Sequence, residues 1–163
     1  MSAFYETSNF EAVAAGQPFI SREEGGHVII FPKEKSIGDR TQLSPKLAIE
    51  YAYTIMLVAE AFTTAMNNVG VPIIRINYAE LGNGAYRTGE PPLMHMHILG
   101  RVDGSKKQAF PDAPYMSKTI APTPDFFDKF EPLKETDVAE IVKQITRLEK
   151  TDKYLPHNWG LAR

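Results

Sequence analysis

The chain has 163 residues, of which 43% are hydrophobic and 23% charged, and its formal net charge is −2. This length and composition predict one globular domain, residues 1–163, with a hydrophobic core of its own. The slightly acidic balance argues against a nucleic-acid partner. The absence of cysteine excludes disulfides, thiolate zinc sites and a cysteine nucleophile.

We expect a cytoplasmic protein without a membrane partner. The N-terminal residues lack the basic segment and long apolar run of a signal peptide. The most apolar region, 47–66, contains Glu50 and Glu60 and directly follows Lys46, and charges at this spacing are unfavourable in a membrane span.

The first predicted strand is 27–31, "HVIIF", which follows Gly25 and Gly26 and is stopped by Pro32. Residues 19–21, "FIS", are expected to pair with it as a hairpin across the turn at 23–26.

The strongest predicted helix is 43–70, where Ser44 is a good N-cap and Pro45 occupies the first helical position. Asn67, Asn68 and Gly70 are typical of its end. Apolar side chains at steps of three and four predict one buried stripe, made of Ala48, Tyr51, Ala52, Ile55, Ala59, Phe62, Met66 and Val69.

The remaining elements are two predicted strands, 72–78 and 93–100, which flank a Gly- and Asn-rich loop at 79–92. Five prolines within 103–135 predict an extended segment on the surface. A closing helix, about 137–150 with Thr136 as its cap, precedes a tail in which Trp159 is expected to dock. This order of elements predicts an α+β domain with a mainly antiparallel sheet.

The stretch 93–101, "LMHMHILGR", places two histidines in an apolar strand. Because side chains alternate along a strand, His95 and His97 share one face with Leu93 and Leu99. The other face, Met94, Met96 and Ile98, is expected to face the core. The histidines, roughly 6–7 Å apart by strand rise, would then face an open surface or a cleft.

Three interpretations of this histidine face are open. The histidines could be ordinary polar side chains on a half-exposed strand. They could bind a metal, because Gly89 precedes His95 at the spacing found in cupin metal motifs. A cupin would place a glutamate soon after His97, where this chain has Arg101 and Val102, and its all-β barrel lacks a long helix. The third interpretation is phosphoryl chemistry at a histidine.

The third interpretation, phosphoryl chemistry at a histidine, is supported by the resemblance of several motifs to a known family. "GGHVIIFPKEK", "LSP" at the start of a long helix, "IIRIN", a Gly-rich loop and "HMHILGR" occur in the order found in the histidine triad (HIT) superfamily. The resemblance covers a core of about residues 18–101, and 102–163 would form a wrapping segment and helix. It implies a HIT-like sheet of about five strands, mainly antiparallel, with one long central helix and a C-terminal helix.

The resemblance also implies an activity. HIT proteins hydrolyse or transfer nucleotides, and the middle histidine of their signature H-φ-H-φ-H-φ-φ (φ apolar) attacks the α-phosphorus. The middle histidine falls on His95, the third on His97, and Leu93 stands in place of the first. His97 would stabilise charge on the phosphate. The implied substrate is a dinucleoside polyphosphate or a nucleoside phosphoramidate, without cofactor or metal, and many HIT proteins are homodimers.

Candidate substrate-binding residues follow from the same resemblance. Asn77 matches an asparagine that helps to position the phosphate, although it could equally start a turn. Thr88 or Gly89 in the loop could offer a hydroxyl or a backbone N–H, and Lys35 stands where many HIT proteins have another histidine after "PK". His27 and His157 are interpreted as structural.

Two alternatives to catalysis remain. The first is a nucleotide-binding protein with little turnover, because the side chain of Leu93 cannot form the hydrogen bonds of an imidazole. The second is a metal-binding module that uses His95 and His97.

Overall fold

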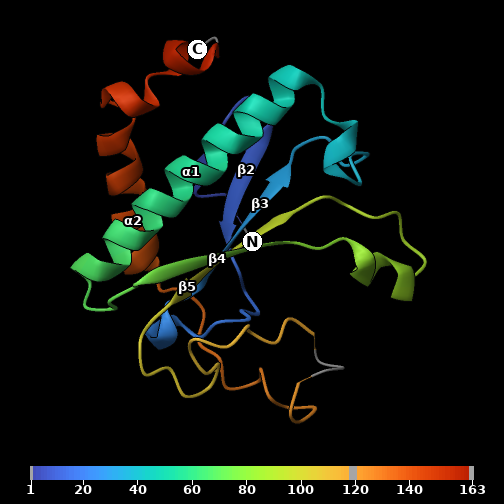
Figure 1. Ribbon diagram of the computed structural model, residues 1–163, viewed down its shortest axis with the longest axis vertical. Helices are drawn as coiled ribbons and strands as arrows, with labels where there is room; N and C mark the ends of the chain where they lie inside the picture. Colours follow the sequence, from blue (N-terminus) through green and yellow to red (C-terminus); the bar gives the residue numbers. More distant parts are fainter. Residues whose placement is uncertain (1, 118–120, 162–163) are drawn as a thin grey trace.

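A computed structural model describes residues 2–117 and 121–161 (Figure 1). Its five strands form one antiparallel sheet in the order β1-β2-β3-β5-β4. The strands are β1 (Tyr5–Glu6), β2 (Phe10–Ala14), β3 (His27–Pro32), β4 (Arg75–Glu80) and β5 (Met96–Arg101). The two α-helices in this described part of the chain are α1 (Pro45–Asn68) and α2 (Glu135–Leu148). The predicted α+β class, the antiparallel sheet and the two helices are confirmed.

The predicted hairpin between 19–21 and 27–31 is wrong, because β3 pairs with β2 and β5 instead. The strand β2 was missed by the sequence analysis. A short 3₁₀ turn at Arg22–Glu24 uses the Ser21 carbonyl, which accepts from the backbone N–H of Glu24 at 2.9 Å and of Gly26 at 3.1 Å. Since this carbonyl is occupied by the turn, it is not available to a strand ladder.

Helix α1 begins where the sequence predicted it. The Ser44 hydroxyl accepts a hydrogen bond from the Leu47 N–H at 3.3 Å, and Pro45 is the first helical residue. Its buried stripe is only partly as predicted, since Ala48, Ala52 and Val69 are exposed. The apolar residues that are buried instead include Tyr53, Leu57, Val58, Ala61 and Ala65.

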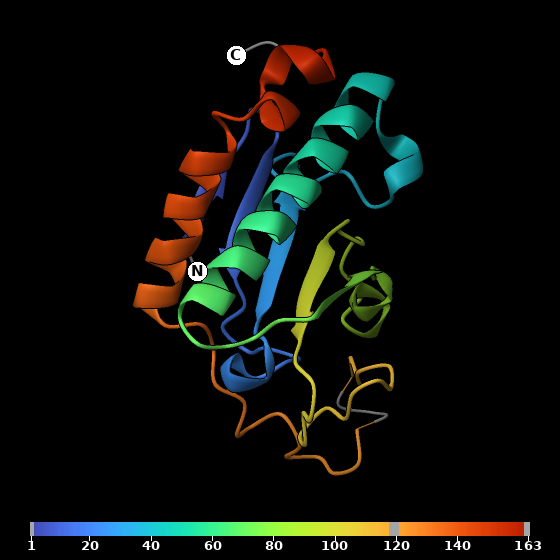
Figure 2. The ribbon, with the colours of Figure 1, turned by 60° about the vertical axis from the view of Figure 1, so that its left-hand side comes forward.

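The reason for this difference is that α1 contacts two partners (Figure 2). Helix α1 lies in front of the sheet, and α2 packs beside α1 on the same side of the sheet. A helix between two neighbours buries a wider arc than one apolar stripe. Within the described residues, neither helix is both long enough and apolar enough to cross a membrane.

The core lies between the sheet and the two helices. Met94, Met96 and Ile98 belong to it, which confirms the face predicted from alternation along the strand. Other members come from every layer, among them Phe10, Val28, Ile30, Leu57, Phe62, Met66, Ile141 and Ile145.

Helix α2 begins two residues earlier than predicted, and Thr136 lies inside it rather than at its cap. The Asp137 carboxylate caps the helix by accepting from the Lys134 N–H at 2.8 Å. The same carboxylate pairs with Arg22 at 2.6 Å and so ties α2 to the turn before β3. Trp159 docks as expected, with its ring 5.4 Å from that of Tyr53 on α1.

The start of β3 is held against β5 by glycines. Gly25 has φ +126°, and a Cβ there would lie 2.2 Å from the Gly100 carbonyl oxygen. The Gly100 N–H in turn donates to the Gly26 carbonyl at 3.1 Å. Only glycine allows the two backbones this approach, which sets His27 directly beside β5.

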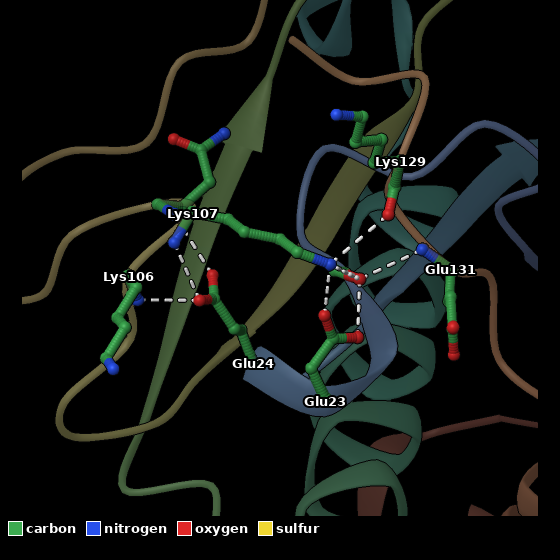
Figure 3. Close-up of polar contacts among 8 residues, drawn as sticks. Glu23, Glu24, Lys106, Lys107, Lys129 and Glu131 are labelled. Carbon is green, nitrogen blue, oxygen red and sulfur yellow. Dashed lines mark hydrogen bonds and ion pairs between the residues drawn. The ribbon is translucent and has the colours of Figure 1, made fainter.

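The strap, defined as residues 103–117, runs past the end of the sheet and is fixed by buried polar side chains. The Glu24 carboxylate accepts three backbone hydrogen bonds, from Lys106 at 2.6 Å, Lys107 at 2.7 Å and Gln108 at 3.0 Å (Figure 3). Beside it, Lys107 forms an ion pair with Glu23 and donates to the Lys129 carbonyl at 3.2 Å. Carboxylate bonds to N–H groups are among the stronger protein hydrogen bonds.

Arg101 binds the carbonyl groups of the strap, whereas Glu24 binds its N–H groups. Its side chain is 1% exposed, and it donates to the carbonyls of Gln108, Ala109 and Asp112 at 2.9–3.1 Å. Its fourth hydrogen bond goes to the Asn77 side chain at 2.9 Å. Burial lowers the pKa of Arg101 from its ordinary value. The strap is therefore held by a carboxylate that collects N–H groups and a guanidinium that collects carbonyls.

Candidate functional site

A cavity of about 800 Å³ lies on the histidine side of β5. Its lining comes from the segment between β2 and β3, the end of β3, the loop between β4 and β5, the start of β5 and the strap. The lining residues are Phe19, Phe31, Leu81, Gly82, Gly84, Ala85, Arg87, Pro91, Leu93, His95, His97, Pro114, Met116 and Ser117. A mostly apolar cavity of this size with a few polar groups is typical of a site for a small molecule.

His95 is half-buried in this cavity, and its ring is fixed from two sides. Its Nδ1 lies 2.8 Å from the backbone carbonyl oxygen of Leu93. The ring stacks on Phe31 with centroids 5.5 Å apart and an angle of 29°. A carbonyl can only accept, so Nδ1 carries the hydrogen, and in the neutral imidazole Nε2 holds the lone pair.

His97 is 5% exposed, and its ring centroid lies 4.6 Å from that of His95 at an angle of 77°. Its Nδ1 is 2.9 Å from Nε2 of His27, which is 1% exposed. Phe19 packs against both of these rings with centroid distances of 5.4 Å. The structure therefore brings three histidines from β3 and the β5 region together.

Both buried histidines are held neutral. Burial, with a smaller effect of His95, lowers the pKa of His97 to about 4. Burial also lowers the pKa of His27 well below its ordinary value, with smaller effects of His97 and then His95. Desolvation disfavours the protonated imidazole, so neither ring carries a charge near neutral pH.

The hydrogen bonds then assign the protons along the chain of rings. The Phe19 backbone N–H donates to Nδ1 of His27 at 3.1 Å, so the hydrogen of His27 is on Nε2. That hydrogen is donated to Nδ1 of His97, which leaves the hydrogen of His97 on its own Nε2. The site thus combines a lone pair on His95 with an N–H donor on His97. A nucleophile beside a donor for a developing oxyanion is the chemistry of group transfer.

Two of the other predicted substrate-binding residues have partners outside the cavity. Asn77 lies in β4, where its side-chain oxygen accepts from Arg101 at 2.9 Å. Lys35 donates to the Glu11 carboxylate at 2.8 Å and to the Pro32 carbonyl at 3.2 Å. Neither side chain is part of the cavity lining described above.

The two predicted loop residues, Thr88 and Gly89, are exposed and follow the 3₁₀ turn η3 (Asn83–Arg87). The Thr88 hydroxyl donates to the Ala85 carbonyl at 3.0 Å. The loop contributes other residues to the cavity, among them Ala85 and Arg87. The placement of these four residues leaves their predicted roles as predictions.

Three features of the site escaped the sequence analysis. His27 was interpreted as structural, yet its ring contacts His97 directly. Leu93 was considered only through its side chain, whereas its backbone carbonyl orients His95. Arg87 was not considered. The "GGH" at the start of the strand was the available signal for His27, but pairing of β3 with β5 could not be read from the sequence.

The side chains around the cavity do not form a set of metal ligands in the described residues. Among the described residues, no group of three or more His, Asp or Glu side chains is arranged to hold a metal ion. His27 and His97 use one nitrogen each in their mutual hydrogen bond. A ligand must offer a lone pair to a metal, and this bond occupies the Nδ1 lone pair of His97.

The chain resembles known proteins in its structure but matches no curated protein by sequence. No protein-family model matches the chain, and no curated protein matches it. Among solved structures, a histidine triad protein from Bradyrhizobium japonicum matches with a TM-score of 0.61 and 14% identity, over 90% of this chain and 88% of the other. A histidine triad protein from Sinorhizobium meliloti matches with a TM-score of 0.60 and 18% identity, over 89% and 87%.

A third structure is described as a zinc-bound histidine triad family protein from Mycobacterium smegmatis. It matches with a TM-score of 0.53 and 18% identity, over 91% of this chain and 88% of the other. At these identities the matches establish the fold. Together with the topology of the sheet, they confirm the resemblance found in the motifs: this chain has the fold of the histidine triad superfamily.

Proposed function

We propose that this protein is a HIT-type nucleotide hydrolase or nucleotidyl transferase that works through a covalent intermediate on His95. The observation that carries the proposal is the chain of hydrogen bonds that leaves a lone pair on Nε2 of His95 and an N–H on Nε2 of His97, beside a cavity of about 800 Å³. The substrate would be a dinucleoside polyphosphate or a nucleoside phosphoramidate.

The reaction has two displacements. In the first, Nε2 of His95 attacks the α-phosphorus and a P–N bond to His95 forms. In a polyphosphate the P–O bond to the leaving group breaks with its electron pair and the phosphate chain departs, whereas in an amidate the leaving nitrogen takes up a proton from solvent as its P–N bond breaks, so that ammonia departs. In the second, water attacks the same phosphorus, the bond to His95 breaks, and nucleoside monophosphate is released with one proton. A second acceptor in place of water gives nucleotidyl transfer. Two easier steps thus replace one difficult displacement.

The other groups have supporting roles in this proposal. The N–H on Nε2 of His97 would donate to a phosphate oxygen as negative charge builds up there. His27 would keep His97 in the tautomer that has this N–H, and the Leu93 carbonyl would keep His95 in the tautomer with a free Nε2. No metal is required for either step.

The test is turnover by wild type and His95→Ala. Both proteins are incubated with adenosine 5′-phosphoramidate and with diadenosine polyphosphates, and release of AMP is measured. The proposal expects release by the wild type and a loss of at least about 10³-fold in the variant. Equal, slow release by both proteins would remove the enzymatic interpretation.

The second candidate, a nucleotide-binding protein with little turnover, is motivated by Leu93 in place of the first triad histidine. Calorimetry with AMP, together with the turnover assay, distinguishes this binding protein from the hydrolase or transferase. Tight binding by wild type without release of product from any of the substrates would favour the binding protein.

A metal-binding module is the third candidate, and the zinc in the Mycobacterium smegmatis structure is its motivation. Metal analysis of the purified protein tests it. Stoichiometric zinc that is lost in a His95→Ala, His97→Ala double variant would replace the hydrolase proposal.

The proposal includes a homodimer, which the resemblance implies and the β4 edge supports. Strand β4 ends the sheet, so among residues 2–117 and 121–161 one side of it has no strand partner. Ile74, which directly precedes β4, is 57% exposed, and Tyr78 within the strand is 52% exposed. An apolar sheet edge of this kind is a usual place for contact between two copies. Sedimentation of wild type and Ile74→Lys tests this, with a dimer expected only for the wild type.

A further inference from the structure

Among the lining residues that the structure describes, Arg87 has the one permanently charged side chain. The described lining contains no lysine, aspartate or glutamate, and its remaining titratable groups are His95 and His97. Burial holds His97 neutral, with a pKa of about 4. The cavity is therefore mildly electropositive, although the whole chain has a net charge of −2.

The guanidinium of Arg87 is available to a ligand. In the described part of the chain its single hydrogen bond is from Nη2 to the Ser117 hydroxyl at 3.5 Å, near the limit for such a contact. It forms no ion pair there, whereas Lys35, the cation predicted from the sequence, already donates to Glu11 at 2.8 Å. A guanidinium has five N–H donors, so most of them remain for an anion.

The position of Arg87 is also defined. It ends the turn η3 on one wall of the cavity, and Ser117 belongs to the strap on another. The strap is anchored by the buried contacts of Glu24 and Arg101 described above. The contact between Arg87 and Ser117 therefore links the loop wall of the cavity to the strap wall.

We propose that Arg87 binds phosphate oxygens beyond the α-phosphorus, so that the preferred substrates carry a polyphosphate chain rather than a neutral leaving group. This inference rests on the proposed function and narrows its substrate class. The histidines provide a nucleophile and a neutral donor for the α-phosphate, and neither of them balances the charge of a departing phosphate chain. A guanidinium fork matches two oxygens of a phosphate and balances this charge.

Kinetics on two substrates tests the inference. Wild type, Arg87→Gln and Arg87→Lys are compared on diadenosine triphosphate and on adenosine 5′-phosphoramidate, whose leaving group is ammonia. Arg147→Gln is the matched control, because Arg147 is exposed on α2 and bonds Gln144 outside the cavity. We expect Arg87→Gln to lower kcat/KM about 10- to 100-fold on the polyphosphate and less than about threefold on the amidate, with Arg87→Lys between.

A binding measurement separates failure of this inference from failure of the proposed function. In a His95→Ala background, calorimetry compares AMP with ADP and ATP. We expect ADP and ATP to bind more tightly than AMP, and Arg87→Gln to remove this gain while AMP binding stays within about threefold. An equal loss for all three nucleotides, or no loss for any, overturns the role of Arg87 whether or not the wild type turns over substrate.

Discussion

Nε2 of His27 lies 2.9 Å from Nδ1 of His97, and this hydrogen bond joins β3 to β5 beside the cavity. Both rings are buried and neutral, so the bond has one donor and one acceptor. Its direction is set by the Phe19 N–H, which occupies the other nitrogen of His27. The residue interpreted from sequence as structural thus determines which nitrogen of His97 can donate.

The first prediction concerns His27 as a positioning residue. In His27→Gln the amide nitrogen can still donate to His97, whereas His27→Leu fills the space without a donor. We expect the leucine variant to lose about 10- to 100-fold in kcat with little change in KM, and the glutamine variant to retain most of the rate. Steady-state kinetics measures both, and thermal melting checks that they fold. Equal kcat values for the two variants would contradict the role.

The second prediction concerns Leu93, which stands where the resemblance to histidine triad proteins places their first histidine. Because the backbone carbonyl of residue 93 accepts from His95, the side chain at this position is not needed to orient the nucleophile. Leu93→Ala and Leu93→His should both keep kcat within about threefold of wild type. A gain of about 100-fold in Leu93→His would instead mean that this chain lacks an imidazole essential for full activity.

The third prediction is a loss of stability in acid. The pKa of His97 is lowered from 6.5 to about 4 in the fold, so between these values the unfolded chain binds a proton that the native state does not. The free energy of unfolding should therefore fall as the pH decreases from 6.5 toward 4, by up to about 3 kcal/mol from this group. His27 contributes in the same direction.

Urea denaturation at pH 7.5, 5.5 and 4.5 measures this effect. His97→Gln cannot bind the proton, so its stability should change less over this range than that of wild type. The control is the wild-type change between pH 7.5 and 8.5, which should be small. An identical pH dependence in the variant would show that other groups, such as surface carboxylates, dominate the acid response.

The fourth prediction concerns the strap. Glu24→Ala removes the acceptor for three backbone N–H groups, so we expect it to lower the free energy of unfolding by about 2–4 kcal/mol. Glu24→Gln keeps one acceptor oxygen and should lose about half as much. Urea denaturation measures the loss, and faster hydrogen exchange at 106–108 should accompany it. Unchanged exchange at these amides would contradict the anchoring role.

The sequence predicted those parts of the fold that depend on local patterns. Ser44 and Pro45 mark the start of α1 because capping involves only neighbouring residues. The alternation of Met94, Met96 and Ile98 with the histidines identified the core face of β5 for the same reason. The hairpin at 19–21 was wrong because a 3₁₀ turn occupies the Ser21 carbonyl, which the strand pattern does not reveal.

The candidate site depends on contacts between residues far apart in the chain. His27 and His97 are separated by 70 positions, and their contact requires the glycine approach of Gly25 to Gly100. The contact between the Leu93 carbonyl and His95 involves a backbone group, which no side-chain pattern describes. The place of Arg87 at the cavity likewise depends on a distant residue, Ser117 of the strap, which contacts its side chain.

Trapping of the covalent nucleotidyl group on His95 is the sharpest test of the proposed mechanism. Excess protein is mixed with diadenosine triphosphate, quenched in alkali, where the phosphorus–nitrogen bond is preserved, and digested for mass spectrometry. We expect an AMP-mass adduct on the peptide that contains His95, which forms before free AMP and is absent from His95→Ala. Release of AMP in this single turnover while the His95 peptide stays unmodified at every time point would contradict it.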